Sequence, residues 1–78
     1  MIREEIEKMM VAISESANEV EESGDFYSLH FEDYQDILIN NQILPVSSLI
    51  LTDTTLDFFG QAGFKRYEFY EITELELE

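Results

Sequence analysis

The stretch Phe26–Leu44, FYSLHFEDYQDILINNQIL, decides the fold of this chain. In its first part, Tyr27, Leu29 and Phe31 alternate with polar residues. A period of two is typical of a strand with one buried face, so a β-strand is predicted over Phe26–Asp33. The apolar side of that strand must be covered by another layer of structure, and the flanking segments have to supply it.

The second part of the stretch predicts a hairpin. Short apolar runs occupy Asp36–Ile39 and Gln42–Leu44. Between them lie Asn40 and Asn41, and asparagine tolerates the positive φ that a tight hairpin turn requires. A helix over Tyr34–Asn41 is the alternative interpretation of the same residues.

The segment before this stretch predicts an amphipathic helix over residues 2–22. Six apolar residues recur there every three or four positions and form one stripe on a helical wheel. Ser23 and Gly24 end the pattern, and Gly24 suits the left-handed position that closes many helices. The stripe consists of Ile2, Ile6, Met9, Ile13, Ala17 and Val20.

The other face of that predicted helix is strongly acidic. On a helix, Glu15, Glu19 and Glu22 would form a row with spacings of about 6 and 10.5 Å along the axis. Such a row is locally unfavourable, because like charges repel at i, i+4 and the end of a helix already carries negative potential. Charges placed against local stability point to a function for them.

The segments after Leu44 are predicted to extend the sheet. Pro45 cannot donate to a ladder and marks an edge or a bend, and Leu49–Thr52 is a further short strand. Residues 53–63 fit either a short helix or a strand and loop. The last fifteen residues predict one long strand with a bulge near Glu71 and Ile72. The predicted fold is α+β: one domain over residues 1–78, with the N-terminal helix packed on an antiparallel sheet of about four strands.

Composition excludes several classes of function. The chain has 18 acidic and four basic residues and a formal net charge of −14, which opposes direct binding to nucleic acid. It has no cysteine, so disulfides and thiolate zinc sites are excluded. No apolar run approaches the ~20 residues of a membrane span and no signal-peptide pattern is present. A cytoplasmic protein without a cofactor is expected.

The residues do not assemble a predicted catalytic or metal site. Ser28, His30 and Glu32 share a strand face, but positions two apart along a strand are about 6–7 Å apart, too far for a catalytic relay. Glu32, Asp33 and Asp36 lack the glycine and the downstream glutamate of a calcium loop. We therefore expect no enzyme and no bound metal.

Aromatic residues are abundant, but their spacing predicts a structural role. The four aromatics at alternating strand positions are expected in the core against the helix, and not as stacking platforms for bases. Lys65 and Arg66 are the only adjacent cations, expected either to anchor neighbouring carboxylates or to orient a partner. The predicted core aromatics are Tyr27, Phe31, Tyr67 and Phe69.

In its small size, acidity and lack of cysteine, the chain resembles phage-encoded inhibitors that mimic DNA, of the anti-CRISPR and anti-restriction kind. The resemblance lies in the character of the whole chain and not in a motif, so no residue role is carried over. It implies a protein of the host cytoplasm that occupies the basic DNA- or PAM-binding surface of a Cas or restriction complex.

Two other functions use the same charge. An immunity protein or antitoxin would neutralise a basic nuclease toxin, and an exposed Tyr34 or Tyr70 beside acids would favour it, since such interfaces concentrate their energy in a few aromatic anchors. A non-enzymatic acidic adaptor is the third possibility. For all three, the predicted partner-binding residues are Glu4, Glu7, Glu15, Glu19, Glu22, Glu32, Asp33, Glu68, Glu71, Glu74 and Glu76.

Overall fold

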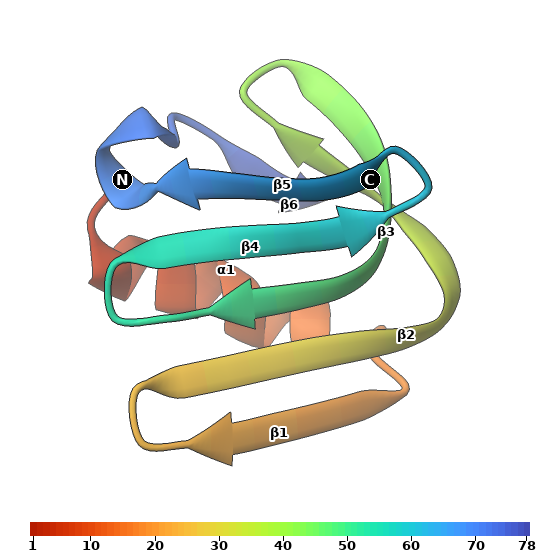
Figure 1. Cartoon of the computed structure of the whole chain (residues 1–78), viewed down its shortest axis with the longest axis horizontal. Coiled ribbons are helices and arrows are strands. Elements are labelled where there is room, and N and C mark those ends of the chain that lie inside the picture. The colour runs from red at the N-terminus through yellow and green to blue at the C-terminus, as the bar shows by residue number, and fades with distance from the viewer.

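One α-helix is followed by six antiparallel β-strands in the computed structural model, which describes residues 1–78 (Figure 1). Strands β1 to β5 pair in chain order, and β6 pairs with the far half of β2. The α+β fold with an N-terminal helix on an antiparallel sheet agrees with the prediction, but the sheet has six strands instead of about four. The elements are α1 (Arg3–Ser14), β1 (Glu19–Ser23), β2 (Phe26–Ile39), β3 (Gln42–Leu51), β4 (Thr55–Gly60), β5 (Gly63–Glu68), the 3₁₀ turn η1 (Phe69–Glu71) and β6 (Leu75–Leu77).

The helix is shorter than the predicted one, which was wrong beyond Ser14. The Ser14 hydroxyl donates to the Val11 carbonyl, and the N–H groups of Ser16 and Ala17 close a tight turn on residues three positions earlier. The chain then leaves the helix, because the Asn18 N–H donates to the His30 carbonyl of β2 at 2.8 Å. Serine and asparagine compete with helical hydrogen bonds through their own side chains, which favours an end here.

Residues 19–22, expected to be helical, instead belong to the edge strand β1. Val20, which extended the helical apolar stripe in the sequence, is 45% exposed on this strand. Gly24 does adopt the predicted positive φ, +60°, but it turns the β1–β2 hairpin and does not close a helix.

Strand β2 continues through the segment for which a helix was the alternative. Asn40 and Asn41 have φ of 48° and 66° and form the predicted tight turn into β3. The β2–β3 register shifts between His30 and Gln35, and β2 bends there to carry the hairpin away from the main sheet (Figure 1). Pro45 lies in the part of β3 that pairs only with β2, as expected of an edge or bend.

The ambiguous segment 53–63 is a strand and turn, β4 leading into β5. Gly60 permits the close approach of the β4 backbone to β3, because a Cβ there would lie 2.0 Å from the Pro45 carbonyl oxygen. The long C-terminal strand was wrong: η1 and a bend separate β5 from β6, which have different partners. Both the N–H and the hydroxyl of Thr73 donate to the Asn40 side-chain oxygen, and these bonds hold the bend.

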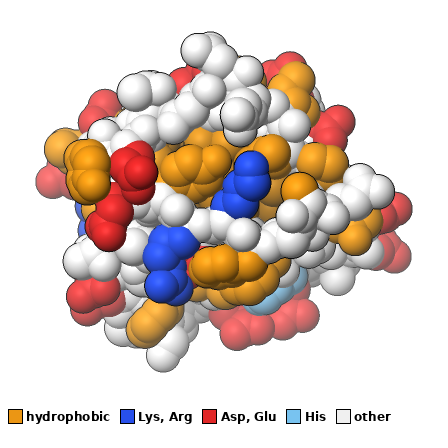
Figure 2. Space-filling view, turned by 45° about the horizontal axis from the view of Figure 1, so that its top comes forward, with side chains coloured by type: hydrophobic (Ala, Val, Ile, Leu, Met, Phe, Trp, Pro, Cys, Tyr) orange, Lys and Arg blue, Asp and Glu red, His pale blue; other side chains and the backbone are white.

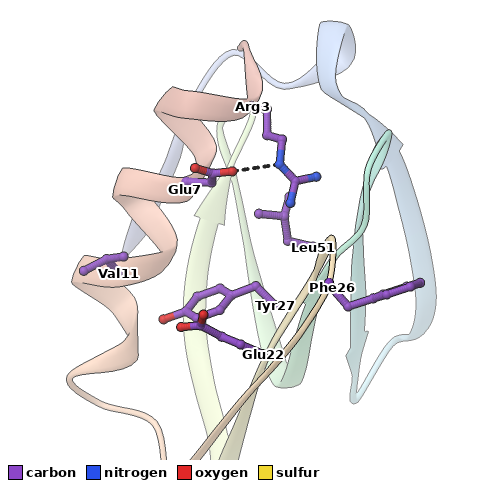
Figure 3. A pocket seen from close by; sticks show the side chains of 8 residues that line it. Arg3, Glu7, Val11, Glu22, Phe26, Tyr27 and Leu51 are labelled. Carbon is purple, nitrogen blue, oxygen red and sulfur yellow. Dashed lines mark hydrogen bonds and ion pairs between the residues drawn. The ribbon is translucent and has the colours of Figure 1, made fainter.

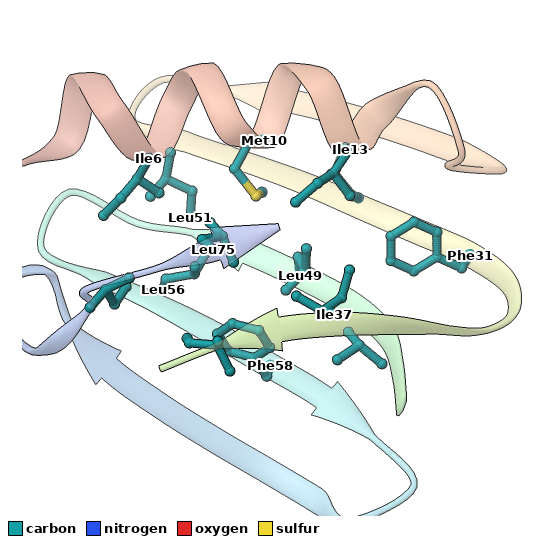
Figure 4. Close-up of a cluster of buried hydrophobic side chains, with 14 residues drawn as sticks. Ile6, Met10, Ile13, Phe31, Ile37, Leu49, Leu51, Leu56, Phe58 and Leu75 are labelled. Atoms are coloured by element: carbon teal, nitrogen blue, oxygen red, sulfur yellow. The ribbon is translucent and has the colours of Figure 1, made fainter. Parts of the chain in front are cut away.

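The core lies between α1, the main sheet and β6 (Figure 4). From the helix it receives Ile6, Met10 and Ile13, so Met10 and not the predicted Met9 is the fully buried methionine. Phe31 is buried as predicted, and Tyr27, Tyr67 and Phe69 pack against the core partly buried. From the strands and the bend the core receives Leu29, Ile37, Ile39, Val46, Leu49, Leu51, Leu56, Phe58, Ile72 and Leu75.

Candidate functional site

The pairing register divides the main sheet into a helix-covered face and an open face. Residues directly opposite one another on neighbouring strands share a face. The buried row through Leu29, Leu49 and Phe58 faces α1, which lies behind the sheet in Figure 1. We call the opposite side the open face, and no helix covers it. Its two central rows are Glu21, Ser28, Ile50, Asp57, Arg66 and Glu19, His30, Ser48, Phe59, Phe64.

Aromatic side chains gather on the open face. The Phe59 and Phe64 rings pair across β4 and β5 with centroids 4.9 Å apart, and they are 37% and 51% exposed. Phe26 lies on the same face at the start of β2 and is 55% exposed. Figure 2 shows hydrophobic side chains together in this region, with basic side chains among them and histidine at their margin. Exposed clusters of this kind mark interaction surfaces.

An ion pair lies beside these rings. Asp57 is 4% exposed although it belongs to the open face, because Arg66 from β5 covers it. The guanidinium donates from Nε to Oδ1 at 2.9 Å and from Nη2 to Oδ2 at 3.0 Å. Its other contact is with Phe64, whose ring centroid lies 5.4 Å from Cζ. Charge pairing and ring stacking therefore fix the Arg66 side chain across the sheet surface.

The ion pair persists at physiological pH. The hydrogen bonds to Asp57, followed by the charge of that carboxylate, raise the pKa of Arg66 above its ordinary value. A raised pKa means that the stabilisation is fully present below the unfolded-state value and is lost only as the pH rises through the folded-state value. Both values lie far above neutrality.

His30 connects the rings to an acidic margin. Its Nδ1 lies 3.0 Å from the Ser48 hydroxyl, and its Nε2 lies 3.8 Å from the Glu21 carboxylate. The latter separation exceeds hydrogen-bond length, so the carboxylate does not orient the ring as an acid does in a catalytic relay. Instead, Glu19, Glu21 and Glu68 border the open face with carboxylates.

The structure separates the acidic row predicted on the helix. Glu15 is the C-cap of α1, whereas Glu19 and Glu22 lie on β1 and point to opposite faces of the sheet. Glu15 instead joins Glu32 and Asp33, from the bend of β2, around a hollow of about 500 Å³.

The remaining predicted acids are dispersed. Glu4 is exposed in the first turn of α1, while Glu7 pairs with Arg3 at 2.7 Å. Near the C-terminus the carboxylates serve backbone groups: Glu71 accepts from the Glu68 N–H, and Glu74 accepts from the Asn41 N–H. Glu76 is exposed on β6, opposite Leu38 of β2.

No three histidine, aspartate or glutamate side chains converge in an arrangement that could hold a metal ion. The one α-helix, of 12 residues, is too short and too polar to cross a membrane.

The sequence analysis did not predict the open-face aromatics. It predicted that Arg66 could anchor a carboxylate, but it did not identify Asp57 as the partner. The adjacent Phe58 and Phe59 held a signal, because neighbours on a strand point to opposite faces and one of them must face outward. Arg66 does anchor a carboxylate as one of its two predicted roles, but Asp57 becomes its neighbour only through the β4–β5 register.

Comparison with known proteins assigns no family to this arrangement. No family model matches the chain, and neither the curated proteins nor the solved structures contain a significant match to it.

Proposed function

We propose that this chain is a non-enzymatic inhibitor that binds a basic protein through its open face. The observation that carries the proposal is the Phe59–Phe64 pair beside the Asp57–Arg66 ion pair, bordered by carboxylates. Stable protein interfaces are commonly built this way, with aromatic and arginine anchors at the centre and a polar rim around them. Arg66 is already held in place, so little side-chain freedom is lost on binding.

The negative charge of the chain indicates that the partner has a basic surface. Acidic side chains border the open face and the whole chain carries −14, so a partner with a basic surface is attracted from a distance. Such steering raises association rates by about 10–10³-fold. Proteins that handle nucleic acid carry basic surfaces of this kind, because they must bind phosphates.

A nuclease of the toxin type is the partner that we favour. Tight protein interfaces concentrate their binding energy in a few aromatic anchors, and the open face supplies three exposed phenylalanines. Tyr34 and Tyr70 are also exposed, at 49% and 82%, and lie next to Asp33 and Glu71 in the chain. An exposed aromatic residue beside an acid favours an immunity protein or antitoxin over a purely electrostatic inhibitor.

DNA mimicry of a Cas or restriction complex is the second candidate. The observation that supports it is the hollow formed by Glu15, Glu32 and Asp33, where carboxylates from two elements gather at one end of the molecule. In that case binding depends on these carboxylates, and it is lost when each is replaced by the corresponding amide, glutamine or asparagine.

The experiment that separates the candidates is a paired neutralisation assay. The wild-type chain is co-expressed with a panel of basic nuclease toxins and, separately, with CRISPR and restriction effectors challenged by a target plasmid. We expect rescue of growth from a toxin, its loss in a Phe59→Ser/Phe64→Ser variant and its retention in a Glu15→Gln/Glu32→Gln/Asp33→Asn variant. The opposite pattern, with protection of the plasmid, would establish DNA mimicry. No effect in either panel would contradict the proposed function.

A further inference from the structure

A cleft lies between α1 and the β1–β2 hairpin, and Phe26 is the one open-face phenylalanine in its lining (Figure 3). Its volume is about 240 Å³, below the roughly 300–1,000 Å³ of sites for drug-sized molecules, so it suits one side chain or a small ion-bearing group. One wall is helical, with Arg3, Glu7 and Val11. The facing wall carries Glu22 and Tyr27.

Arg3 closes one end of the cleft and makes three hydrogen bonds to the rest of the fold. Its Nε donates to Glu7 at 2.7 Å, Nη2 donates to the Asp25 carbonyl at 2.7 Å, and Nη1 donates to the Thr52 carbonyl. Arg3 thereby ties the helix to two sheet turns. Each of its three nitrogens already donates to one of these acceptors, and the Glu7 carboxylate balances its charge, so the cleft is not built to hold an anion.

The remaining polar groups favour a cation. The Glu22 side chain makes no hydrogen bond or ion pair within the chain, and only one Glu7 oxygen accepts from Arg3. Figure 3 shows the Glu22 carboxylate beside the Tyr27 ring, on the side of the cleft that faces Val11. Val11 is 60% exposed, and Leu51 forms an apolar part of the lining. The cleft thus combines carboxylates on opposite walls, an aromatic ring and an apolar surface.

We infer that this cleft binds a primary ammonium on an alkyl stem, supplied by a lysine side chain of the basic partner. The stem lies against Val11 and Leu51, and the ammonium lies between Glu7, Glu22 and the face of Tyr27. An ammonium has three donors that diverge and can reach acceptors on opposite walls, whereas a guanidinium fork pairs best with a single carboxylate. An aromatic face adds attraction for a cation.

This inference rests on the proposed function for the source of the lysine, but its test does not need the partner. Nα-acetyl-lysine methylamide is titrated into the isotopically labelled chain, and amide chemical shifts are followed by NMR. Nα-acetyl-norleucine methylamide, which has the stem without the charge, is the matched probe. We expect saturable shifts at Val11, Gly24 and Tyr27 with the lysine probe and not with the norleucine probe.

Two pairs of variants locate the binding. Glu22→Gln should raise the Kd of the lysine probe at least threefold. Glu76→Gln, which makes the same change of net charge on β6, should leave that Kd unchanged. Val11→Trp should block the cleft at an exposed helix position, with Ala12→Trp as its control on the adjoining helix surface. Equal effects within either pair, or shifts spread over all acidic surfaces, would overturn the inference.

The source of the ammonium is tested with putrescine. If putrescine binds at least tenfold more tightly than the lysine probe, the ligand of the cleft is a free diamine and not a lysine side chain of the partner. If the lysine probe fails but loss of Phe59 and Phe64 still abolishes neutralisation, the cleft inference fails and the proposed function stands. If the lysine probe binds specifically but no neutralisation is seen, the proposed function fails and the binding of an ammonium in the cleft stands.

Discussion

At the scale of single residues, the Asp57–Arg66 pair has an uncommon setting. The carboxylate is buried on the side of the sheet that no other element covers, and its burial depends on one exposed arginine. A surface ion pair usually contributes little, but a desolvated carboxylate that loses its partner is strongly destabilising. The pair should therefore matter more for the stability of the open face than an ordinary surface ion pair does.

We predict that Arg66→Met lowers the thermal midpoint by more than about 8 °C, because it leaves the Asp57 carboxylate buried and unpaired. The double variant Asp57→Leu/Arg66→Met should recover most of that loss, since it removes the charge together with its partner. Circular dichroism melts of the two variants and the wild-type chain measure this. Additive or greater destabilisation in the double variant would show that the ion pair does not act as a unit.

The limits of sequence reasoning appear most clearly at this scale. Alternation around Leu29 and Phe31 predicts which β2 residues are buried, because that signal is local. The contact of Asp57 with Arg66 and that of His30 with Ser48 depend on strand register, which residues distant in the chain determine. The centre of the candidate site was therefore hidden from the sequence, while its acidic composition was not.

At the scale of elements, the boundary between α1 and β1 shows how tertiary pairing overrides periodicity. Ala17 and Val20 continue the helical spacing of Ile6 and Ile13, and for that reason the sequence favours a longer helix. In the structure, the five residues of β1 pair with β2 instead. This pairing depends on the neighbouring strand, and no local sequence pattern reveals it. The Asn40–Asn41 turn was predictable, since its residue types match its backbone geometry.

The β1–β2 turn gives a test of this assignment. Gly24 has a φ of +60° and open space around its Cβ position, so Gly24→Ala adds backbone strain without a steric clash. We predict a loss of about 1 kcal/mol, or a decrease of about 4–8 °C in the thermal midpoint. Gly24→Asn should be nearly neutral, because asparagine tolerates this conformation. An equal loss in both variants would argue against the left-handed turn.

At the scale of the whole molecule, the net charge of −14 opposes folding through self-repulsion. Only three ion pairs form within the chain, counting that of His30, so most carboxylates have no cationic partner. The thermal midpoint should therefore rise as NaCl increases from about 0.02 M to about 0.3 M, because the screening length falls below about 8 Å in that range. A midpoint independent of salt would contradict the expected repulsion.

The same charge acts in the opposite direction on binding. A basic partner relieves the repulsion, so complex formation should weaken as salt increases, even though the free chain becomes more stable. An interface with aromatic anchors retains part of its affinity at high salt, because burial of apolar surface is not screened. This combination follows from a sheet that carries rings at the centre of its open face and carboxylates at its margin.

The most direct test of the open face uses the toxin that the neutralisation assay is expected to identify, and compares its affinity for Phe59→Ser/Phe64→Ser with that for Ile43→Ser at physiological salt. Ile43 is 53% exposed, close to Phe64 at 51%, but lies next to the β2–β3 turn. We predict at least about a 30-fold increase in Kd for the double phenylalanine variant, as expected for a hot spot, and less than threefold for Ile43→Ser, with both variants folded by circular dichroism. Equal effects, or an unchanged Kd for the phenylalanine variant, would contradict the assignment of the open face as the binding surface.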